Sequence, residues 1–495
     1  MSTITSLIKS GAWLSVANII SKLTNALALP IIARLLGPQS LGIYNIVISL
    51  AQTVQGFSGL GIEIALQRNG ARHQTIGTEA IGRLFGVAFT LICSVNVVMG
   101  LGVWLFRKPL AEHWLTEPGV SPWLGAAAIL AGLQPLGNIP LLFLVGLQDF
   151  RAYAIRSSLG LIVGNTVTLL SAWQFGLKGA IGGLILSAVL QIVWSYLIVK
   201  PVLQAKAIHL RFDHFWQEVR SILKFGLPYY LGTNLLFSLI NLPLMGLVSH
   251  YSGLESLGYL RAAQNMGSLV GFIPLAIAPA VISHLSASST NEGQHGYLKS
   301  VHLRSVWILL LLSSSTTCLF LPNLITWLFG TDYQPAIILA WLFLWASVLT
   351  GITAVSIQYL VVDGKTARVG WGSTIGAVCW VLPALVLIPR YGALGFLISH
   401  VTSSIVEVLL LVYPAIANVK SEDLLLLRNL TGLSGFLFLW TLIVFLLHLN
   451  NILTYLLSLA IAMVAVLFIF MYVLHSAEQL KVKKALRSMA IRVGL

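Results

Sequence analysis

Apolar runs of about 20 residues follow one another along the whole chain, and short polar stretches separate them. A helix of that length can cross the hydrocarbon core of a bilayer. The runs lack the strict apolar–polar alternation that is typical of a transmembrane β-barrel. The pattern therefore predicts an all-α polytopic membrane protein with about 14 transmembrane helices. The expected spans are residues 12–36, 41–66, 80–106, 122–147, 153–175, 180–199, 223–249, 257–286, 303–329, 335–361, 368–388, 392–415, 430–448 and 452–474.

The first apolar run carries a polar stripe, Asn18, Lys22 and Asn25. Spacings of four and three residues place all three on one face of a helix. A lysine at the centre of a membrane-spanning helix costs roughly 2.5–3.5 kcal/mol on insertion scales, so it needs an explanation. We expect this face to line a water-filled cavity.

Three short segments of the first half recur, in the same order, in the second half. The offsets between the pairs are 216, 213 and 214 residues: Ser40–Tyr44 with Ser256–Leu260, Gly179–Ile185 with Gly392–Ile398, and Asp149–Arg151 with Asp363–Lys365. A parallel repeat of six spans is an arrangement typical of transporters. The repeat predicts two six-helix bundles with a cleft between them, followed by a C-terminal helical hairpin.

This organisation gives four expected segments. They are an N-terminal lobe (1–200), a cytoplasmic linker with room for a small amphipathic helix (201–222), a C-terminal lobe (223–416), and a hairpin with a basic cytoplasmic tail (417–495).

A set of candidate cavity residues follows when the offset of 216 is applied to the first stripe and the second span of each half is included. The set is Asn18, Lys22, Asn25, Arg34, Asn45, Gln52, Glu63, Asn234, Ser238, Asn241, Arg261 and Asn265. In the alternative interpretation the amides only join helices, at about 0.6 kcal/mol each, and Arg34 and Arg261 lie at the outer rim. A stripe that is basic and amidic, with almost no acid, favours anions and sugar hydroxyls over cationic drugs.

Composition and charge agree with the membrane class, since 57% of residues are hydrophobic and 9% are charged. Most of the 29 Lys and Arg lie in loops on the side of the two termini, which predicts cytoplasmic termini. The net charge of +14 is therefore a topology signal, and we expect no nucleic-acid partner. The sequence shows no nucleophile–base set, metal spacing or nucleotide-binding loop, so we expect neither enzymatic activity, nor a metal, nor a cofactor.

The run Ile32-Ala33-Arg34-Leu35-Leu36-Gly37-Pro38-Gln39-Ser40-Leu41-Gly42-Ile43-Tyr44, followed by Gly59-Leu60-Gly61-Ile62, resembles the N-terminal signature of bacterial polysaccharide transporters. These are the lipid-linked oligosaccharide flippases (Wzx type) of the multidrug/oligosaccharidyl-lipid/polysaccharide (MOP) exporter superfamily. The resemblance implies a V-shaped two-lobed fold that works by alternating access in the bacterial inner membrane.

The same resemblance implies a substrate, undecaprenyl pyrophosphate bearing a short oligosaccharide such as an O-antigen repeat unit. This lipid would pass from the cytoplasmic to the periplasmic leaflet. Membrane lipids and the polysaccharide polymerase machinery are the implied partners.

Three alternatives stay open. A lipid II flippase would share the fold and the span count. A cation-coupled multidrug exporter of the same superfamily usually has twelve spans and acids in its cavity, which Lys22 disfavours. A membrane glycan polymerase or ligase usually carries a large periplasmic loop with catalytic charges, whereas the outer loops here are short.

Overall fold

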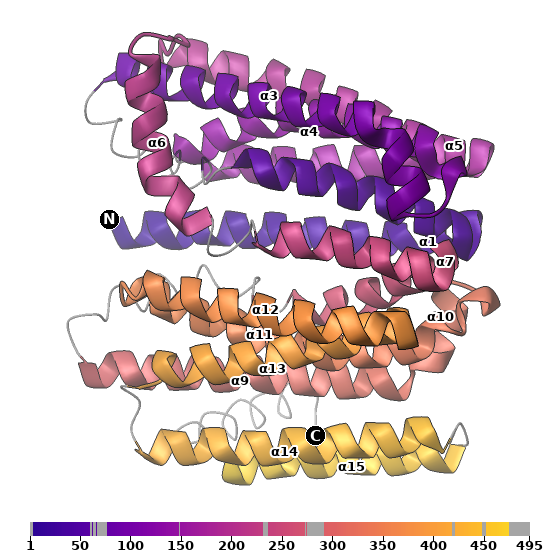
Figure 1. Cartoon of the computed structure of the whole chain (residues 1–495). Coiled ribbons are helices and arrows are strands. Elements are labelled where there is room, and N and C mark those ends of the chain that lie inside the picture. Colours follow the sequence, from indigo (N-terminus) through magenta and orange to yellow (C-terminus); the bar gives the residue numbers. More distant parts are fainter. Residues whose placement is uncertain are drawn as a thin grey trace, which may run out of the picture.

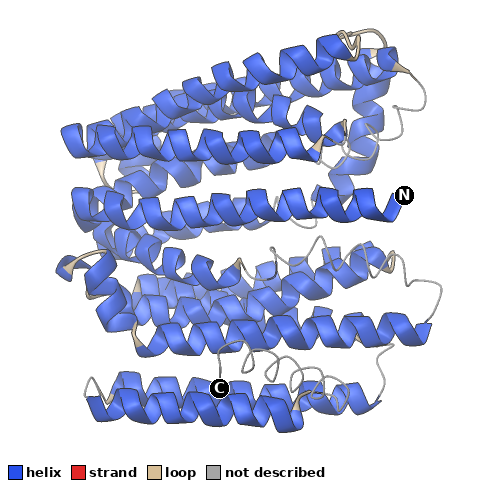
Figure 2. Cartoon of the chain, turned by 180° about the vertical axis from the view of Figure 1, so that it is seen from behind, coloured by secondary structure: helices blue, strands red, loops and turns tan. Residues whose placement is uncertain are grey.

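The computed structural model describes residues 3–59, 77–147, 149–230, 236–272, 292–417, 421–447 and 452–474, together with the single positions 62, 66 and 274. The described residues form helices and their connections, with no strand among them (Figure 2). The all-α prediction is confirmed. In the described part, eight helices are long and apolar enough to cross a membrane, or nine if one bent pair forms a single span. The exact number of fourteen spans stays a prediction.

Three helices are much longer than one membrane crossing: α1 (Thr3–Gly59), α5 (Phe150–Ala205) and α7 (Leu236–Gly271). Each breaks at a glycine, at Gly37, Gly176 and Gly253, where φ is +73°, +58° and +76°. Glycine adopts these angles because it has no Cβ to clash with the backbone. Each long helix therefore contains two of the expected spans.

The remaining helices complete two bundles and a hairpin. They are α3 (Thr78–Pro109), α4 (Ser121–Gly146), α6 (Phe215–Tyr230), α9 (Glu292–Leu319), α10 (Leu321–Leu328), α11 (Ala336–Val362), α12 (Thr366–Tyr391), α13 (Ala393–Ala415), α14 (Ser421–Leu446) and α15 (Ile452–Tyr472). Helices α1, α3, α4 and α5 pack together, as do α7, α9, α11, α12 and α13, and the α14–α15 pair packs on α9 (Figure 1).

We call the end of the molecule where Thr3 lies the near end, and the end where α1 breaks at Gly37 the far end (left and right in Figure 1). The helices run between these two ends.

The backbone confirms the internal repeat. Gly37 has φ 73° and ψ 170°, and Gly253 has φ 76° and ψ 172°. Gly176 has φ 58° and ψ −134°, and Gly392 has φ 56° and ψ −128°. Both pairs are 216 residues apart in the sequence. The two bundles are therefore copies in one continuous register.

This register corrects two of the sequence offsets. Gly176, and not Gly179, is the counterpart of Gly392, so the offset of 213 was three residues short. Asp149 and Asp363 are not counterparts either. Asp149 caps α5 by accepting a hydrogen bond from the Ala152 amide at 3.1 Å, whereas Asp363 follows the last turn of α11. Short apolar segments rich in glycine and alanine can be aligned with one another at several offsets. The positions where the helices break identify the correct offset.

Helix α6 runs across the near end, roughly perpendicular to the long helices (Figure 1). It covers Phe215–Tyr230, so its second half overlaps the expected seventh span, 223–249. The helix is amphipathic, with charged residues among its apolar ones. The segment before it docks on α3: the Arg211 amide donates to the Gly82 carbonyl at 3.1 Å, and the Arg211 guanidinium pairs with Glu79 at 2.9 Å.

The expected ninth span, 303–329, is not one straight helix. Helix α9 ends at Leu319 and α10 leaves it at an angle of 74°. Pro322 lies in the first turn of α10, where its missing N–H costs nothing, but it cannot continue the α9 hydrogen bonds. The proline explains why the break falls here.

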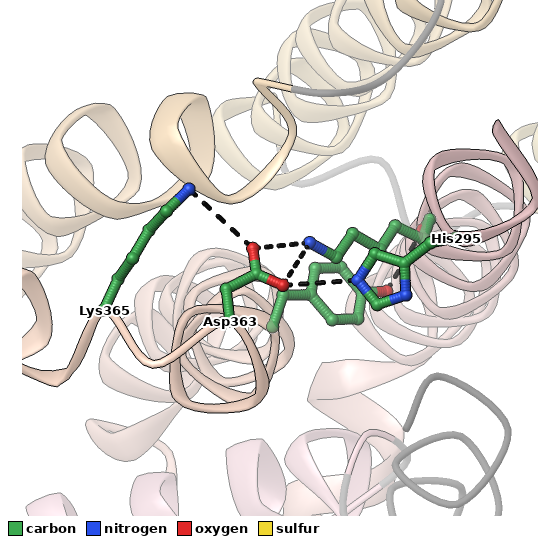
Figure 3. A network of polar contacts seen from close by, with 5 residues as sticks. His295, Asp363 and Lys365 are labelled. Atoms are coloured by element: carbon green, nitrogen blue, oxygen red, sulfur yellow. Dashed lines mark hydrogen bonds and ion pairs between the residues drawn. The ribbon is translucent and has the colours of Figure 1, made fainter. Parts of the chain in front are cut away.

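A buried polar network ties α9 to α11 at the near end (Figure 3). Lys299 is 1% exposed, and its Nζ donates to both carboxylate oxygens of Asp363 at 2.8 and 2.7 Å. The ring of His295 contacts the same carboxylate at 3.2 Å, and Lys365 lies 3.8 Å from it. The carboxylate compensates a lysine charge that the fold has removed from water.

Asp363→Asn should lower the free energy of unfolding by about 3 kcal/mol at neutral pH, because it leaves Lys299 buried without a counter-charge. Burial by itself raises the pKa of the Asp363 carboxyl, but hydrogen bonds from Lys299 and His295, and the charges of Lys299 and Lys365, outweigh it and hold the pKa below 3.8. The stabilisation is therefore complete above that value and is lost as the pH falls through the folded-state pKa.

Thermal unfolding in detergent tests this expectation. The gap in Tm between the wild type and Asp363→Asn should be constant from about pH 7 to pH 5 and should shrink below about pH 4. Asp332→Asn, the same change at an exposed aspartate, should show almost no gap at neutral pH. A gap that persists unchanged to pH 3 would contradict the assignment.

A second buried pair attaches the C-terminal hairpin to the second bundle. The Arg304 guanidinium pairs with Asp423 of α14 at 3.3 Å and donates to the Val473 carbonyl, just after α15, at 2.7 Å. Ser300 donates to the same Asp423 carboxylate at 2.9 Å. One arginine thus contacts both ends of the hairpin.

Candidate functional site

The polar face of α1 is exposed where the structure describes it. Lys22 and Asn25 are both exposed, and the Asn25 side-chain oxygen accepts a hydrogen bond from Asn165 of α5 at 2.8 Å. Among the described residues no carboxylate lies within ion-pair distance of Lys22. Asn18 lies on the same helix, but its side chain is outside the described set. Lys22 is therefore exposed, and its role as a cavity residue stays a prediction.

The second segment of α1 divides its polar residues between two environments. Asn45 is buried; it donates to the Leu257 carbonyl of α7 at 3.4 Å and accepts from Ser49 at 3.4 Å. Gln52, two turns further along, is exposed. Glu63 lies outside the described residues. In this conformation Asn45 joins the bundles, whereas Gln52 is accessible.

The counterparts on α7 are described only in part. Asn234 lies outside the described residues, as does the side chain of Ser238. Asn241 is half-buried and makes a weak contact, at 3.7 Å, with the sulfur of Met245. Asn265 is buried, and its side-chain oxygen has no hydrogen-bond partner. The role of these residues as a cavity lining stays a prediction.

Arg261 lies at the boundary between the two bundles. It is close enough to Tyr44 of α1 for an electrostatic interaction, and its Nε is buried without a hydrogen-bond partner. Asn45 is its counterpart in the repeat and bonds to Leu257, one turn before Arg261. The repeat thus brings its two equivalent polar positions together.

A set of hydrogen bonds joins the two bundles at the far end. Arg34 donates to the carbonyls of Thr326, at 3.4 Å, and Trp327; Tyr333 donates to Ala33 at 3.0 Å, Ser249 to Leu115 at 3.5 Å, and Asn45 to Leu257 at 3.4 Å. Each of these bonds has a main-chain carbonyl as its acceptor. We call this set of contacts the far-end seal.

Two glycines allow the bundles to meet in the seal. A Cβ on Gly42 would collide with the Leu254 carbonyl, and a Cβ on Gly258 would collide with the Pro38 carbonyl. Gly42 and Gly258 are 216 residues apart, as are Pro38 and Leu254. The contact is therefore reciprocal, as expected at a two-fold axis between repeats.

A groove of about 410 Å³ lies beside the seal, lined by residues of α9, α10, α11 and α14 and of the turn before α11. Its lining includes Cys318, Asn323, Thr326, Gln334 and Phe445, and none of the candidate cavity residues. The groove is thus separate from the polar stripe of α1.

A family profile described as "Polysaccharide biosynthesis protein" matches residues 31–338, more than half of the chain. The chain belongs to this family. The matched segment includes the whole Ile32–Tyr44 run, so the resemblance to bacterial polysaccharide transporters is confirmed.

Other comparisons agree with the family. This polysaccharide biosynthesis protein is 23% identical over 365 residues to "Succinoglycan biosynthesis transport protein ExoT" of Rhizobium meliloti (strain 1021), covering 70% of the chain and 68% of the relative. Its fold is similar to "Lipid II flippase MurJ, inward closed conformation", with a TM-score of 0.71, 13% identity, and 92% and 97% of the two chains covered.

A multidrug MATE transporter of the MOP superfamily, in an inward-facing conformation, gives a TM-score of 0.64 at 17% identity, with 83% and 98% covered. The superfamily fold is therefore common to transporters of quite different substrates.

In this polysaccharide biosynthesis protein the candidate set predicted from the sequence did not include Asn165 and Gln134. Asn165 bonds to Asn25, and Gln134 accepts a hydrogen bond from Gln55 of α1. Both are amide residues inside expected spans, and this position could have added them to the candidate set. Arg156 had no predicted role in the site, although it lies in the expected span 153–175; the structure buries it within α5.

Proposed function

We propose that this protein flips undecaprenyl-pyrophosphate-linked oligosaccharide, an O-antigen or related surface polysaccharide repeat unit, from the cytoplasmic to the periplasmic leaflet of the bacterial inner membrane. The observation that carries the proposal is the exposed Lys22, without an acidic partner among the described residues, in a member of a polysaccharide biosynthesis family. A relative named as a succinoglycan transport protein supports export of a glycan.

The proposed orientation places both termini and the near end in the cytoplasm. Basic residues concentrate at that end, in agreement with the positive-inside rule. Residues 1–200 and 223–416 then act as the two lobes, 201–222 link them, and 417–495 form the hairpin and tail. The far-end seal becomes the periplasmic gate, closed in this conformation.

In the proposed mechanism the two lobes open alternately to the near end and to the far end. The substrate's pyrophosphate enters from the near end and pairs with Lys22, because a multiply charged anion needs a cation to leave water. Arg261 lies at the far-end boundary, where its guanidinium becomes available when the seal opens. Exposed amides such as Asn25 and Gln52 donate to the sugar hydroxyls, and the polyprenyl chain stays in the bilayer.

The proposal involves no covalent chemistry, so the protein acts as a transporter and not as an enzyme. It hands its product to the polysaccharide polymerase machinery on the periplasmic side. A lipid II flippase is the second candidate, since the fold is similar to that of MurJ at a TM-score of 0.71.

Complementation separates these functions. In a strain that lacks its O-antigen flippase, the wild-type chain should restore surface glycan. In a strain depleted of its lipid II flippase, it should not restore growth. Rescue of growth without surface glycan would favour lipid II, and a rise in drug resistance with no glycan at the surface would favour a multidrug exporter.

A further inference from the structure

Arg156 of α5 is a buried cation without a partner. Only 2% of the residue is exposed, and Nε, Nη1 and Nη2 all lack a hydrogen bond. No ion pair reaches it in the described part of the chain. Buried charges in proteins are normally paired and hydrogen-bonded, because desolvation otherwise makes them costly. An arginine left in this state has donors positioned for a ligand.

The Ser158 hydroxyl, two residues from Arg156 in sequence, is likewise buried without a hydrogen-bond partner. Two other polar groups, close in sequence to Arg156 or to Trp194, have partners elsewhere. Asp149 caps the first turn of α5 at the Ala152 amide, and Ser195 donates to the Gly137 carbonyl at 2.7 Å. The feature that faces the guanidinium is the Trp194 ring, whose centroid lies 5.7 Å from the Arg156 Cζ. Trp194 is 38% exposed. This cation–π contact does not use the N–H donors of the guanidinium.

The second copy of the repeat shows that the fold does not need this arginine. Arg156 and Trp194 correspond, at the offset of 216, to Gly372 and Leu410. A Cβ on Gly372 would collide with the side chain of Leu411, so α12 and α13 pack tightly at that position. The same position in the first bundle holds a long charged side chain. The difference points to a function of the first bundle only.

The position of Arg156 along the helix indicates the chemistry available to it. It lies six residues after Phe150, or about 9 Å along the helix from the near end. Two further cation–aromatic pairs lie at that end, Arg151 over Trp13 at 5.8 Å and Lys200 over Tyr196 at 5.5 Å. Basic and aromatic side chains concentrate where a membrane protein meets lipid headgroups.

We propose that Arg156 is a binding site for a lipid-borne phosphate, beside the Trp194 ring, on the first bundle and apart from the α1 stripe. Arginine suits this ligand because its planar N–H donors bind two phosphate oxygens at once. The occupant carries a phosphate at the membrane surface, either as the carrier pyrophosphate or as an anionic phospholipid. The further step, in which the carrier is captured here before it reaches Lys22, rests on the proposed function.

Native mass spectrometry of the delipidated full-length protein tests the site, with undecaprenyl pyrophosphate, phosphatidylglycerol and uncharged diacylglycerol as probes. The wild type should retain at least one phosphate-bearing lipid and no diacylglycerol. Arg156→Met should retain that lipid at least tenfold less, Arg156→Lys should keep most of it, and Arg428→Met, at an exposed arginine of α14, should match the wild type within twofold.

Thermal unfolding gives a second measurement, and its expected result differs from that for an arginine with a purely structural role. Without lipid, Arg156→Met should be at least as stable as the wild type, because it removes an unpaired buried charge. Added phosphate-bearing lipid should raise the Tm of the wild type and leave that of Arg156→Met unchanged. A lower Tm of the lipid-free variant, or equal lipid retention by both proteins, would overturn the proposal.

The two probes separate this site from the proposed function. If the wild type retains phosphatidylglycerol but not undecaprenyl pyrophosphate, and Arg156→Met loses it, the site stands and carrier capture fails. If Arg156→Met retains whichever lipid the wild type retains, the site itself fails, whatever the substrate of the transporter.

Discussion

Lys22→Ala should abolish surface glycan in the complementation strain while the amount of protein in the membrane stays unchanged. The lysine is exposed on α1, and no carboxylate pairs with it among the described residues. A hydrogen bond to a charged group is worth about 1.5–3 kcal/mol, so the loss corresponds to at least about tenfold in export. Lys22→Arg keeps the positive charge and should retain partial function.

Lys178→Ala provides the matched control, because Lys178 is an exposed lysine at the far end, just after the α5 break at Gly176. It should export glycan at the wild-type rate. Normal export by Lys22→Ala would instead mean that Asn18, Lys22 and Asn25 only join helices, and the proposed anion contact would be wrong.

Gly42→Ala and Gly258→Ala should each open the far-end seal and impair transport. The added methyl group meets a main-chain carbonyl, of Leu254 or of Pro38, which cannot rotate away as a side chain can. Overpacking costs about 1–3 kcal/mol, and a bias of that size shifts a two-state equilibrium by about 5- to 150-fold. The expected shift is away from the conformation described here.

Cysteine accessibility measures this shift. Ser249 is 2% exposed and belongs to the seal, so Ser249→Cys should resist a membrane-impermeant maleimide added outside the cell. Adding Gly258→Ala should make the same cysteine reactive. Gly102→Ala is the control, because a Cβ there meets nothing within 4 Å, and it should leave both labelling and export unchanged. Equal labelling with and without Gly258→Ala would refute the gate.

The elements of the fold could largely be predicted from the sequence because their signals are local. Apolar runs of sufficient length require helices in a membrane, since every backbone polar group must be satisfied within the helix. The recurrence of Ser40–Tyr44 at Ser256–Leu260 gave the correct offset of 216. The repeat of Gly179 at Gly392 misled by three residues, because the helix breaks at Gly176 and the sequence alone gave no backbone angles.

The candidate site was predictable only in part. The structure describes Lys22 and Asn25 of the stripe as exposed, and their contact with a polar ligand stays a prediction. The bonds of Arg34 and Asn45 could not be anticipated, because both side chains donate to main-chain carbonyls far away in sequence. Every residue carries such an acceptor, so no residue type marks the position where one will be used.

The sequence by itself determined the membrane class, the helical architecture, the two-fold repeat and the basic character of the stripe on α1. All four follow from the length of apolar runs and from spacing along one helix. The tertiary structure alone decided which polar residues seal the bundles at the far end and that Arg156 is buried without a partner. Burial and pairing depend on what the other helices place beside a residue, and that proximity leaves no trace in local spacing.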